Sequence, residues 1–327
     1  MSISQLNPRI LAAFAAIYVL WGSTYLAVAV AVTSIPPFLL MGSRSLAGGL
    51  ILFLYAKRNG ASSPVRSWLI AGACGLLFFV GCHGVLAFAQ QRVPSGVAAI
   101  ILATIPFWIA LIGFVIPAEK PVRPWTLVFL VPGLAGVALI AWRQLAAGQA
   151  ALQLSDILLL LASSFSWALG SVLSERHSSQ ETSAVALSGM ALIVGGAALL
   201  VFSAGLGEIR LSGLAAPSAA SLLAWAYLTL AGTVVAFASY VWLLERISPT
   251  LVGTYTFVNP IIAVLLGWAI LGEPVAASML AGGTLVVGSI IGLLAADHVS
   301  PAKPKQAAHD AQLLTARSSA IGSCSSA

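Results

Sequence analysis

Few residues of this chain could carry chemistry, and two of them lie deep inside apolar segments. Arg44 and His83 each stand in a long segment with no other charged residue. A cation within a membrane helix costs about 2.5–3.5 kcal/mol on insertion scales and is a functional candidate by default. Arg44 could hold a substrate carboxylate, pair with backbone carbonyls, or extend its stem toward the membrane interface. His83 could relay protons, because imidazole titrates near neutral pH, or simply be hydrogen-bonded within the protein.

Two tryptophans lie near the middle of apolar segments rather than at their ends. Trp21 begins the run Trp-Gly-Ser-Thr-Tyr, which contains Ser23, and Trp167 precedes a Gly-Ser pair. Tryptophan usually prefers the membrane interface, so two central tryptophans favour the wall of a cavity. The alternative is close helix packing through the neighbouring Gly and Ser residues. Tyr240, near the end of a later segment, either lines the same path or belongs to an interfacial belt.

The stretch 246–273 combines a central proline with polar neighbours. Pro260 removes one backbone hydrogen bond near the middle of an apolar run long enough to cross a bilayer. Such a break is tolerated in hydrocarbon only where protein or a water-filled cavity covers it. Asn259 adjoins the break, and Tyr255 lies one turn earlier on the same face. These three residues are therefore predicted to present polar groups at mid-membrane.

The same design occurs once before in the chain. Arg246, Pro260, Gly267 and Glu273 recur with identical spacing as Arg92, Pro106, Gly113 and Glu119. This match predicts two half-length repeats, each with a proline-broken helix. Isoleucines occupy positions 101 and 105, where the second half has Tyr255 and Asn259, so the cavity is expected to be asymmetric.

Composition excludes most classes of protein. Of the 327 residues, 60% are hydrophobic and 7% are charged, and the mean hydropathy is +1.02. Soluble domains average about 25% charged residues, so the chain is a polytopic membrane protein. The three cysteines show no metal-binding spacing, and no phosphate-binding or catalytic motif is present. We expect no metal, no cofactor and no nucleic-acid partner, and the net charge of +6 is ascribed to cytoplasmic loops.

Ten apolar segments organise the chain as an all-α membrane protein. They cover about residues 10–32, 36–56, 68–90, 95–116, 125–142, 156–174, 182–204, 217–243, 249–271 and 275–296. The first repeat is predicted to be 1–142, the linker 143–155 and the second repeat 156–296. Residues 297–327 are expected to form a disordered cytoplasmic tail.

The distribution of basic residues predicts the orientation. With the N-terminus inside, the inner connections hold most of the Lys and Arg residues, and the outer ones hold only Arg92, Arg143 and Arg210. This asymmetry places both termini in the cytoplasm. Because each half has five spans, the second half enters the membrane inverted relative to the first. Inverted repeats with broken helices meeting at mid-membrane are a recurring transporter architecture.

The last apolar segment carries Gly288 and Gly292 in a GxxxG pattern. Such a pattern packs either a homodimer or an internal helix pair. The sequence therefore leaves the choice between a monomer and a homodimer open.

Several motifs together carry a family resemblance. They are WGSTY, FLLMGSRSLAGGLIL, VPSGVAAIILATIPFWIAL, SFSWALGSVLSER and SPTLVGTYTFVNPIIAVLLGWAILGEP. With them the chain, over about residues 10–296, resembles the EamA-type transporters of the drug/metabolite transporter superfamily. The resemblance implies a bacterial inner-membrane permease of ten helices in a five-plus-five inverted repeat. It also implies efflux of small metabolites such as amino acids through a central cavity. The run Ala118-Glu119-Lys120 departs from the more common Gly-Glu-Arg turn.

The leading hypothesis is therefore a secondary transporter that exports small, partly apolar metabolites by alternating access. Its substrate-binding candidates are Trp21, Ser23, Arg44, His83, Trp167, Tyr240, Tyr255 and Asn259, with helix breaks at Pro106 and Pro260. The alternatives are a membrane-embedded enzyme and a non-transporting sensor or partner. The spans offer few acid or base groups for an enzyme, and the loops are too short for a soluble signalling domain.

Overall fold

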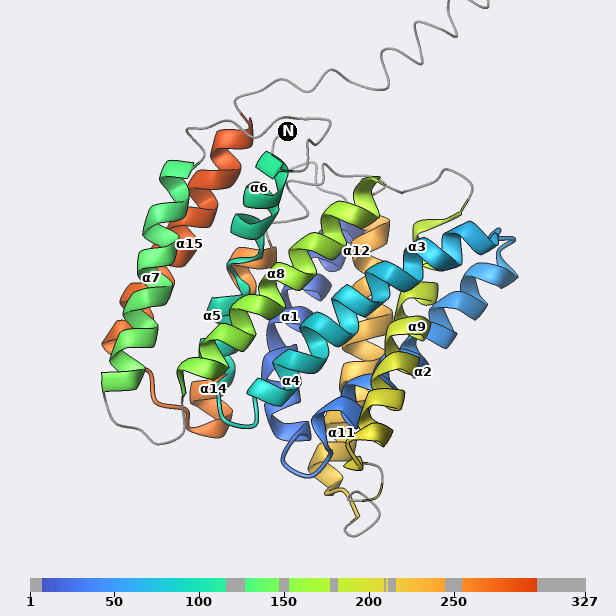
Figure 1. The fold of residues 1–327 in the computed structure, drawn as a ribbon, viewed down its shortest axis with the longest axis horizontal. Coiled ribbons are helices and arrows are strands. Elements are labelled where there is room, and N and C mark those ends of the chain that lie inside the picture. The colour runs from blue at the N-terminus through green and yellow to red at the C-terminus, as the bar shows by residue number, and fades with distance from the viewer. Residues whose placement is uncertain are drawn as a thin grey trace, which may run out of the picture.

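The computed structural model describes residues 8–115, 127–146, 153–176, 182–208, 210, 216–244 and 255–298. The regular secondary structure in these ranges is entirely helical (Figure 1). The predictions for Glu119, Arg246 and residues 299–327 fall outside them.

The helices of the first half follow the five apolar segments expected there. They are α1 (Pro8–Ala31), α2 (Pro37–Arg58), α3 (Val65–Gly75), η2 (Leu76–Gly84), α4 (Val85–Ala89), α5 (Ser95–Leu102), α6 (Ile105–Val115) and α7 (Leu127–Ala146). Pro36, Pro64 and Pro94 directly precede the starts of α2, α3 and α5. Proline is suited to a helix start, since its missing N–H and fixed φ cost nothing there.

The second half also places helix in each of its five expected segments. Its helices are α8 (Leu154–Arg176), α9 (Ala184–Gly205), α11 (Ala219–Tyr227), η4 (Leu228–Val235), α12 (Ala236–Leu244), α14 (Tyr255–Leu271) and α15 (Ala277–His298). Ser183 and Ser218 cap α9 and α11 by accepting backbone N–H bonds from Ala186 and Ser221. The helix α15 continues two residues into the region where a disordered tail was expected.

Seven stretches within the described ranges are long and apolar enough to cross a membrane. They are Pro8–Ala31, Pro37–Arg58, Val65–Ala89, Ser95–Gly113, Leu154–Ser174, Ala184–Gly205 and Ala219–Tyr240. Two shorter apolar stretches, Val258–Leu271 and Ala277–Ser289, follow them. The chain is therefore a multi-pass membrane protein, as composition predicted.

Two helix pairs hold the bundle together at its sides. Helix α2 lies along α9, and α7 lies along α15 (Figure 1). Glycines allow the first pair to approach closely: a Cβ at Gly49 or Gly196 would come within 2.9 Å of the opposing backbone. In a membrane, close packing of this kind replaces the hydrophobic driving force that water supplies elsewhere. A Cβ at Gly292 of α15 would likewise overlap Phe129 of α7, so this glycine of the GxxxG pattern packs inside the chain.

The two central prolines behave differently. In the first half the helix is interrupted at Ala103 and Thr104, directly before α6, whose second residue is Pro106. In the second half α14 runs without interruption from Tyr255 to Leu271 with Pro260 inside it. The prediction of a break at Pro260 is therefore wrong for the described helix. Pro260 lies near the start of α14, where the loss of one backbone hydrogen bond does not interrupt the remaining turns.

Two π-helical segments, which the sequence analysis did not predict, interrupt otherwise α-helical spans. The segment η2 separates α3 from α4, and η4 separates α11 from α12. Each lies within the third helical span of its half. Wide turns of this type shift the register of following side chains and are frequent at functional sites.

Two carboxylates accept hydrogen bonds at helix starts in distant parts of the chain. Glu273 accepts from Ser95 N at 2.8 Å and from Ser95 Oγ at 2.9 Å at the start of α5. Glu208 accepts from Leu39 N at 3.0 Å near the start of α2. Both acids follow a glycine with positive φ, Gly272 at 66° and Gly207 at 77°. A left-handed residue ends each helix and turns the next side chain back toward its partner.

An ion pair also joins distant parts of the chain. Arg92 donates to Asp156 with an Nη2–Oδ1 distance of 2.5 Å, and Asp156 is fully buried. This charge-assisted hydrogen bond raises the pKa of Arg92 above its ordinary value. It joins the connection before α5 to the first turn of α8, and so links the two halves.

Candidate functional site

The predicted residues Trp21, Tyr240 and Tyr255 form one aromatic cluster. The Trp21 ring centroid lies 5.2 Å from that of Tyr240 and 4.7 Å from that of Tyr255. Phe237, which the sequence analysis did not select, lies 6.5 Å from Trp21 and 6.0 Å from Tyr240. Three helices supply these rings: α1, α12 and α14. All four side chains are only partly buried, so this aromatic cluster keeps some accessible surface.

A backbone contact fixes the orientation of Trp21. Its Nε1 donates to the carbonyl oxygen of Gly232 in η4 at 3.0 Å. This bond satisfies the only polar group of the indole and uses a carbonyl from a π-helical turn. The π-helix thus positions one wall of the aromatic cluster.

Asn259 lies on α14 one turn beyond Tyr255. It is only 8% exposed, and its Oδ1 has no hydrogen-bond partner among the described residues. A buried amide oxygen without a partner is costly in a structural role, because desolvation is not repaid. This favours Asn259 as a group that meets a polar ligand or water.

Ser23 is not part of this cluster. Its Oγ shares a hydrogen bond of 2.6 Å with the hydroxyl of Tyr227 in α11 and donates to the Val19 carbonyl. Two residues along a helix turn a side chain to a different face, so Ser23 and Trp21 point apart. Ser23 joins α1 to α11.

The remaining predicted residues, Arg44, His83 and Trp167, come together in a second group, which we call the cationic group. The His83 and Trp167 ring centroids are 5.1 Å apart, and an electrostatic interaction links Arg44 with His83. Phe78 lies 4.7 Å from Trp167, and Phe79 lies 5.4 Å from His83. Helices α2, η2 and α8 each contribute at least one member. Nothing in the sequence placed Arg44 near His83, because the contact depends on how α2 meets η2.

Serines of α8 support η2. Ser166 Oγ donates to the Leu77 carbonyl at 2.8 Å, and Ser163 Oγ donates to the Cys82 carbonyl at 2.9 Å. A π-helical turn alters the normal backbone pattern, and side-chain hydroxyls can satisfy the carbonyls it leaves. The run 163–166 therefore holds η2 in place rather than serving only as a small packing surface.

The two groups have related constructions. Trp21 and Trp167 occupy the same position counted from the starts of α1 and α8. Trp21 contacts η4 and the helix after it, and Trp167 contacts η2. Pro106 belongs to neither group within the contacts described, but it marks the interruption between α5 and α6.

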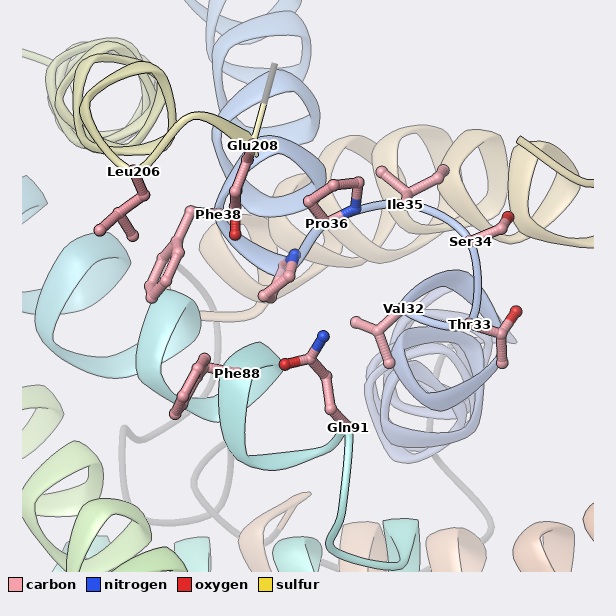
Figure 2. Close-up of a pocket in the computed structure, with 11 residues that line it drawn as sticks. Val32, Thr33, Ser34, Ile35, Pro36, Phe38, Phe88, Gln91, Leu206 and Glu208 are labelled. Carbon is pink, nitrogen blue, oxygen red and sulfur yellow. The ribbon is translucent and has the colours of Figure 1, made fainter. Parts of the chain in front are cut away.

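An open pocket of about 370 Å³ lies away from both groups, beside the connection between α1 and α2. Figure 2 shows Glu208 and Gln91 extending toward it from opposite sides, with Phe38 and Phe88 forming apolar walls. The Glu208 carboxylate already accepts bonds from Leu39 N and Ser203 Oγ. This pocket contains none of the predicted substrate-binding residues. In the described part of the chain, no group of three His, Cys, Asp or Glu residues is arranged to hold a metal ion.

Known proteins resemble this chain over nearly its whole length. The uncharacterized inner membrane transporter YedA of Escherichia coli is 34% identical over 309 residues, which are 93% of this chain and 96% of that protein. Protein PecM of Dickeya dadantii is 26% identical, covering 83% of this chain and 87% of its own. The probable amino-acid metabolite efflux pump of Salmonella typhimurium is 23% identical, covering 84% and 91%.

A solved crystal structure shares the fold, with a TM-score of 0.61, 21% identity and coverage of 90% of this chain and 99% of that one. The EamA-like transporter family matches the sequence twice, over residues 8–142 and over residues 154–295. The family match, the length of the shared region and the apolar helices agree. The chain is therefore a member of the EamA-like transporter family.

Proposed function

We propose that this protein is a secondary carrier of the bacterial inner membrane that exports small metabolites, amino acids among them, by alternating access. The observation that carries the proposal is the aromatic cluster, formed by helices of both halves, with Asn259 one turn along α14: the rings are partly accessible, and the amide oxygen has no partner among the described residues. The names of the relatives support the substrate range, since one is described as a probable amino-acid metabolite efflux pump.

The helix contacts support two inverted five-helix repeats. If each helix is exchanged for its counterpart five spans away, the contact of α1 with α14 becomes the contact of α8 with α6. The contact of α1 with η4 becomes that of α8 with η2. The pairs α2 with α9 and α7 with α15 map onto themselves. Contacts that exchange in this way are expected of two halves related by a pseudo-twofold axis. The proposal therefore includes ten spans, five in each half, with both termini in the cytoplasm.

Such a symmetry supplies a route to transport. When two similar halves pack around one site, each can adopt the conformation of the other at little cost in free energy. The site then opens alternately to the two sides of the membrane. The aromatic cluster and Asn259 would bind the solute between these states.

Purified protein in liposomes tests the proposal. We expect protein-dependent counterflow of at least one labelled compound from a panel of amino acids and related metabolites, and uptake into everted membrane vesicles. Protein-free liposomes are the control. Comparing flux with and without an imposed pH gradient separates proton exchange from facilitated diffusion. Absence of protein-dependent flux across a broad panel would reject the carrier assignment.

A further inference from the structure

The side chain of Arg44 is a buried charge whose counter-ion is not found in the described protein. It is 6% exposed, and its Nε has no hydrogen-bond partner there. Arginine stays protonated in proteins, so burial does not remove the charge. An isolated buried cation is strongly destabilising unless an anion or several acceptors compensate it.

The carboxylates whose side chains the structure describes are all engaged elsewhere. Asp156 pairs with Arg92, Glu208 accepts from Leu39 and Ser203, and Glu273 accepts from Ser95 and Gly96. None of the three acids is free to neutralise Arg44.

The surroundings of Arg44 point to a ligand with an apolar body. His83 lies on η2, which packs against the Arg44 helix α2, and its buried Nδ1 also lacks a hydrogen-bond partner among the described residues. The His83 ring then contacts Trp167 and Phe79, and Trp167 contacts Phe78. A cation and an imidazole nitrogen thus stand beside an aromatic surface, within a span that contains a π-helical segment.

We infer that the cationic group is the subsite for the carboxylate of the transported solute, so that the carrier selects solutes with one carboxylate and an apolar body, amino acids included. This inference rests on the proposed transport function and names its substrate class. A guanidinium presents paired N–H donors that match a carboxylate. One cation beside a histidine balances a single negative charge, which favours a carboxylate over a phosphate dianion. The aromatic rings contact the remainder of the solute.

Binding to protein in lipid nanodiscs tests this subsite without requiring transport. The probes are matched pairs of an arylalkanoic acid and its amide, such as 3-phenylpropionate and 3-phenylpropionamide, together with 3-phenylpropylamine and inorganic phosphate. Tryptophan fluorescence and the thermal unfolding midpoint report binding. We expect the wild type to bind acids at least about tenfold more tightly than their amides, and to bind the amine and phosphate weakly.

The variants separate Arg44 from general effects of charge. R44Q should abolish the preference for acid over amide, and R44K should retain part of it. R58Q is the matched control, because Arg58 is exposed at the end of the same helix, and it should bind like the wild type. If R44Q does not yield folded protein, R44K and the wild-type ligand series decide the question.

Several binding results would overturn the inference. They are equal affinity of acids and amides for the wild type, an undiminished acid preference in R44Q, and phosphate that competes as well as the carboxylate. Absence of binding across the acid panel would count in the same way. Acid-selective binding without any flux in liposomes would instead reject the transport function, whereas flux of neutral solutes independent of Arg44 would reject only this subsite.

Discussion

At the scale of single residues, the interior contains polar groups that the described helices do not satisfy. Arg44 Nε, His83 Nδ1 and Asn259 Oδ1 are buried without hydrogen-bond partners among the described residues. In a membrane protein such groups are costly, and they are therefore informative about function. By contrast, the Nε1 of Trp21 is fully satisfied by a backbone carbonyl. Removing an unsatisfied group should affect function more than stability, and removing a satisfied group should affect both.

Asn259→Ala tests the removal of an unsatisfied polar group. Since the amide oxygen makes no described hydrogen bond, its loss leaves no partner unpaired, and the unfolding midpoint should stay close to that of the wild type. Counterflow in liposomes should fall at least severalfold if the amide contacts the solute. Thr284→Ala is the matched control, because Thr284 is exposed and bonds only within its own helix. Wild-type flux in the Asn259 variant would assign this residue to packing.

Trp21→Phe and Trp21→Ala test the removal of a polar group that is satisfied by a hydrogen bond. Phenylalanine keeps an aromatic ring but leaves the Gly232 carbonyl without its donor, at a cost of about 1–3 kcal/mol. Alanine also removes the contacts with Tyr240 and Tyr255 and should change the order of preference among transported solutes. Competition assays with the labelled solute measure that order. An unchanged order in Trp21→Ala would contradict a role in the cavity wall.

At the scale of elements, close approach between helices and the caps of their ends determine how the spans fit. Helix α3 and helix α9 meet where Gly75 faces the backbone of Ala191. The carboxylate of Glu273, just beyond the end of α14, accepts hydrogen bonds from Ser95 at the start of α5. Both contacts join segments far apart in the sequence, so each can be tested by its effect on the stability of the whole bundle.

Gly75→Ala should destabilise the protein. A Cβ there would overlap the carbonyl oxygen of Ala191, and neither backbone can move without shifting a helix. Overpacking of this kind typically costs about 1–3 kcal/mol. Gly288→Ala is the matched control, since a Cβ at that position meets nothing within 4 Å. The thermal unfolding midpoint in detergent should fall for the first variant and not for the second.

Glu273→Gln should weaken the start of α5. The amide oxygen can accept one of the two Ser95 hydrogen bonds, but the amide nitrogen cannot accept the other, and the negative charge that favours a helix N-terminus is lost. We expect a loss of roughly 1 kcal/mol, visible as a lower unfolding midpoint. An unchanged midpoint would mean that this cap adds nothing to the stability of the fold.

At the scale of the whole molecule, the proposed inversion fixes which connections face the outside. With both termini in the cytoplasm, Ser62 between α2 and α3 is inside, and Pro217 before α11 is outside. Single cysteines at these positions in a background without Cys74, Cys82 and Cys324 test this. A membrane-impermeant maleimide should label Pro217→Cys in intact cells and Ser62→Cys only after permeabilisation. The reverse pattern, or labelling of both in intact cells, would contradict the orientation.

Sequence reasoning found the helical segments and most residues of both groups, but not their pairing. Trp21 and Trp167 were identified because tryptophan at mid-span is unusual. Asn259 was identified because it adjoins a proline, and Tyr255 because it lies one turn earlier on the same face. The two π-helical segments were missed, since the hydrophobic pattern of η2 and η4 resembles that of an ordinary helix. Pro260 was expected to break its helix because a proline always lacks the backbone N–H, which can be known from the sequence. Whether the helix continues past the proline depends on the packing around it, and α14 does continue.

The sequence by itself determined that the chain is a helical membrane protein, and it predicted two half-length repeats. A membrane-spanning helix is recognised from the hydropathy of about 20 consecutive residues, and the repeat from the recurring positions of proline and glycine. Both can be found without knowing which residues are in contact. Only the tertiary structure decided which polar groups meet. Asp156 reaches Arg92 and Glu273 reaches Ser95 across helices, whereas Arg44 meets no described acid. Such pairings depend on the positions of packed helices to within a few ångström, because hydrogen bonds and ion pairs act only at short range.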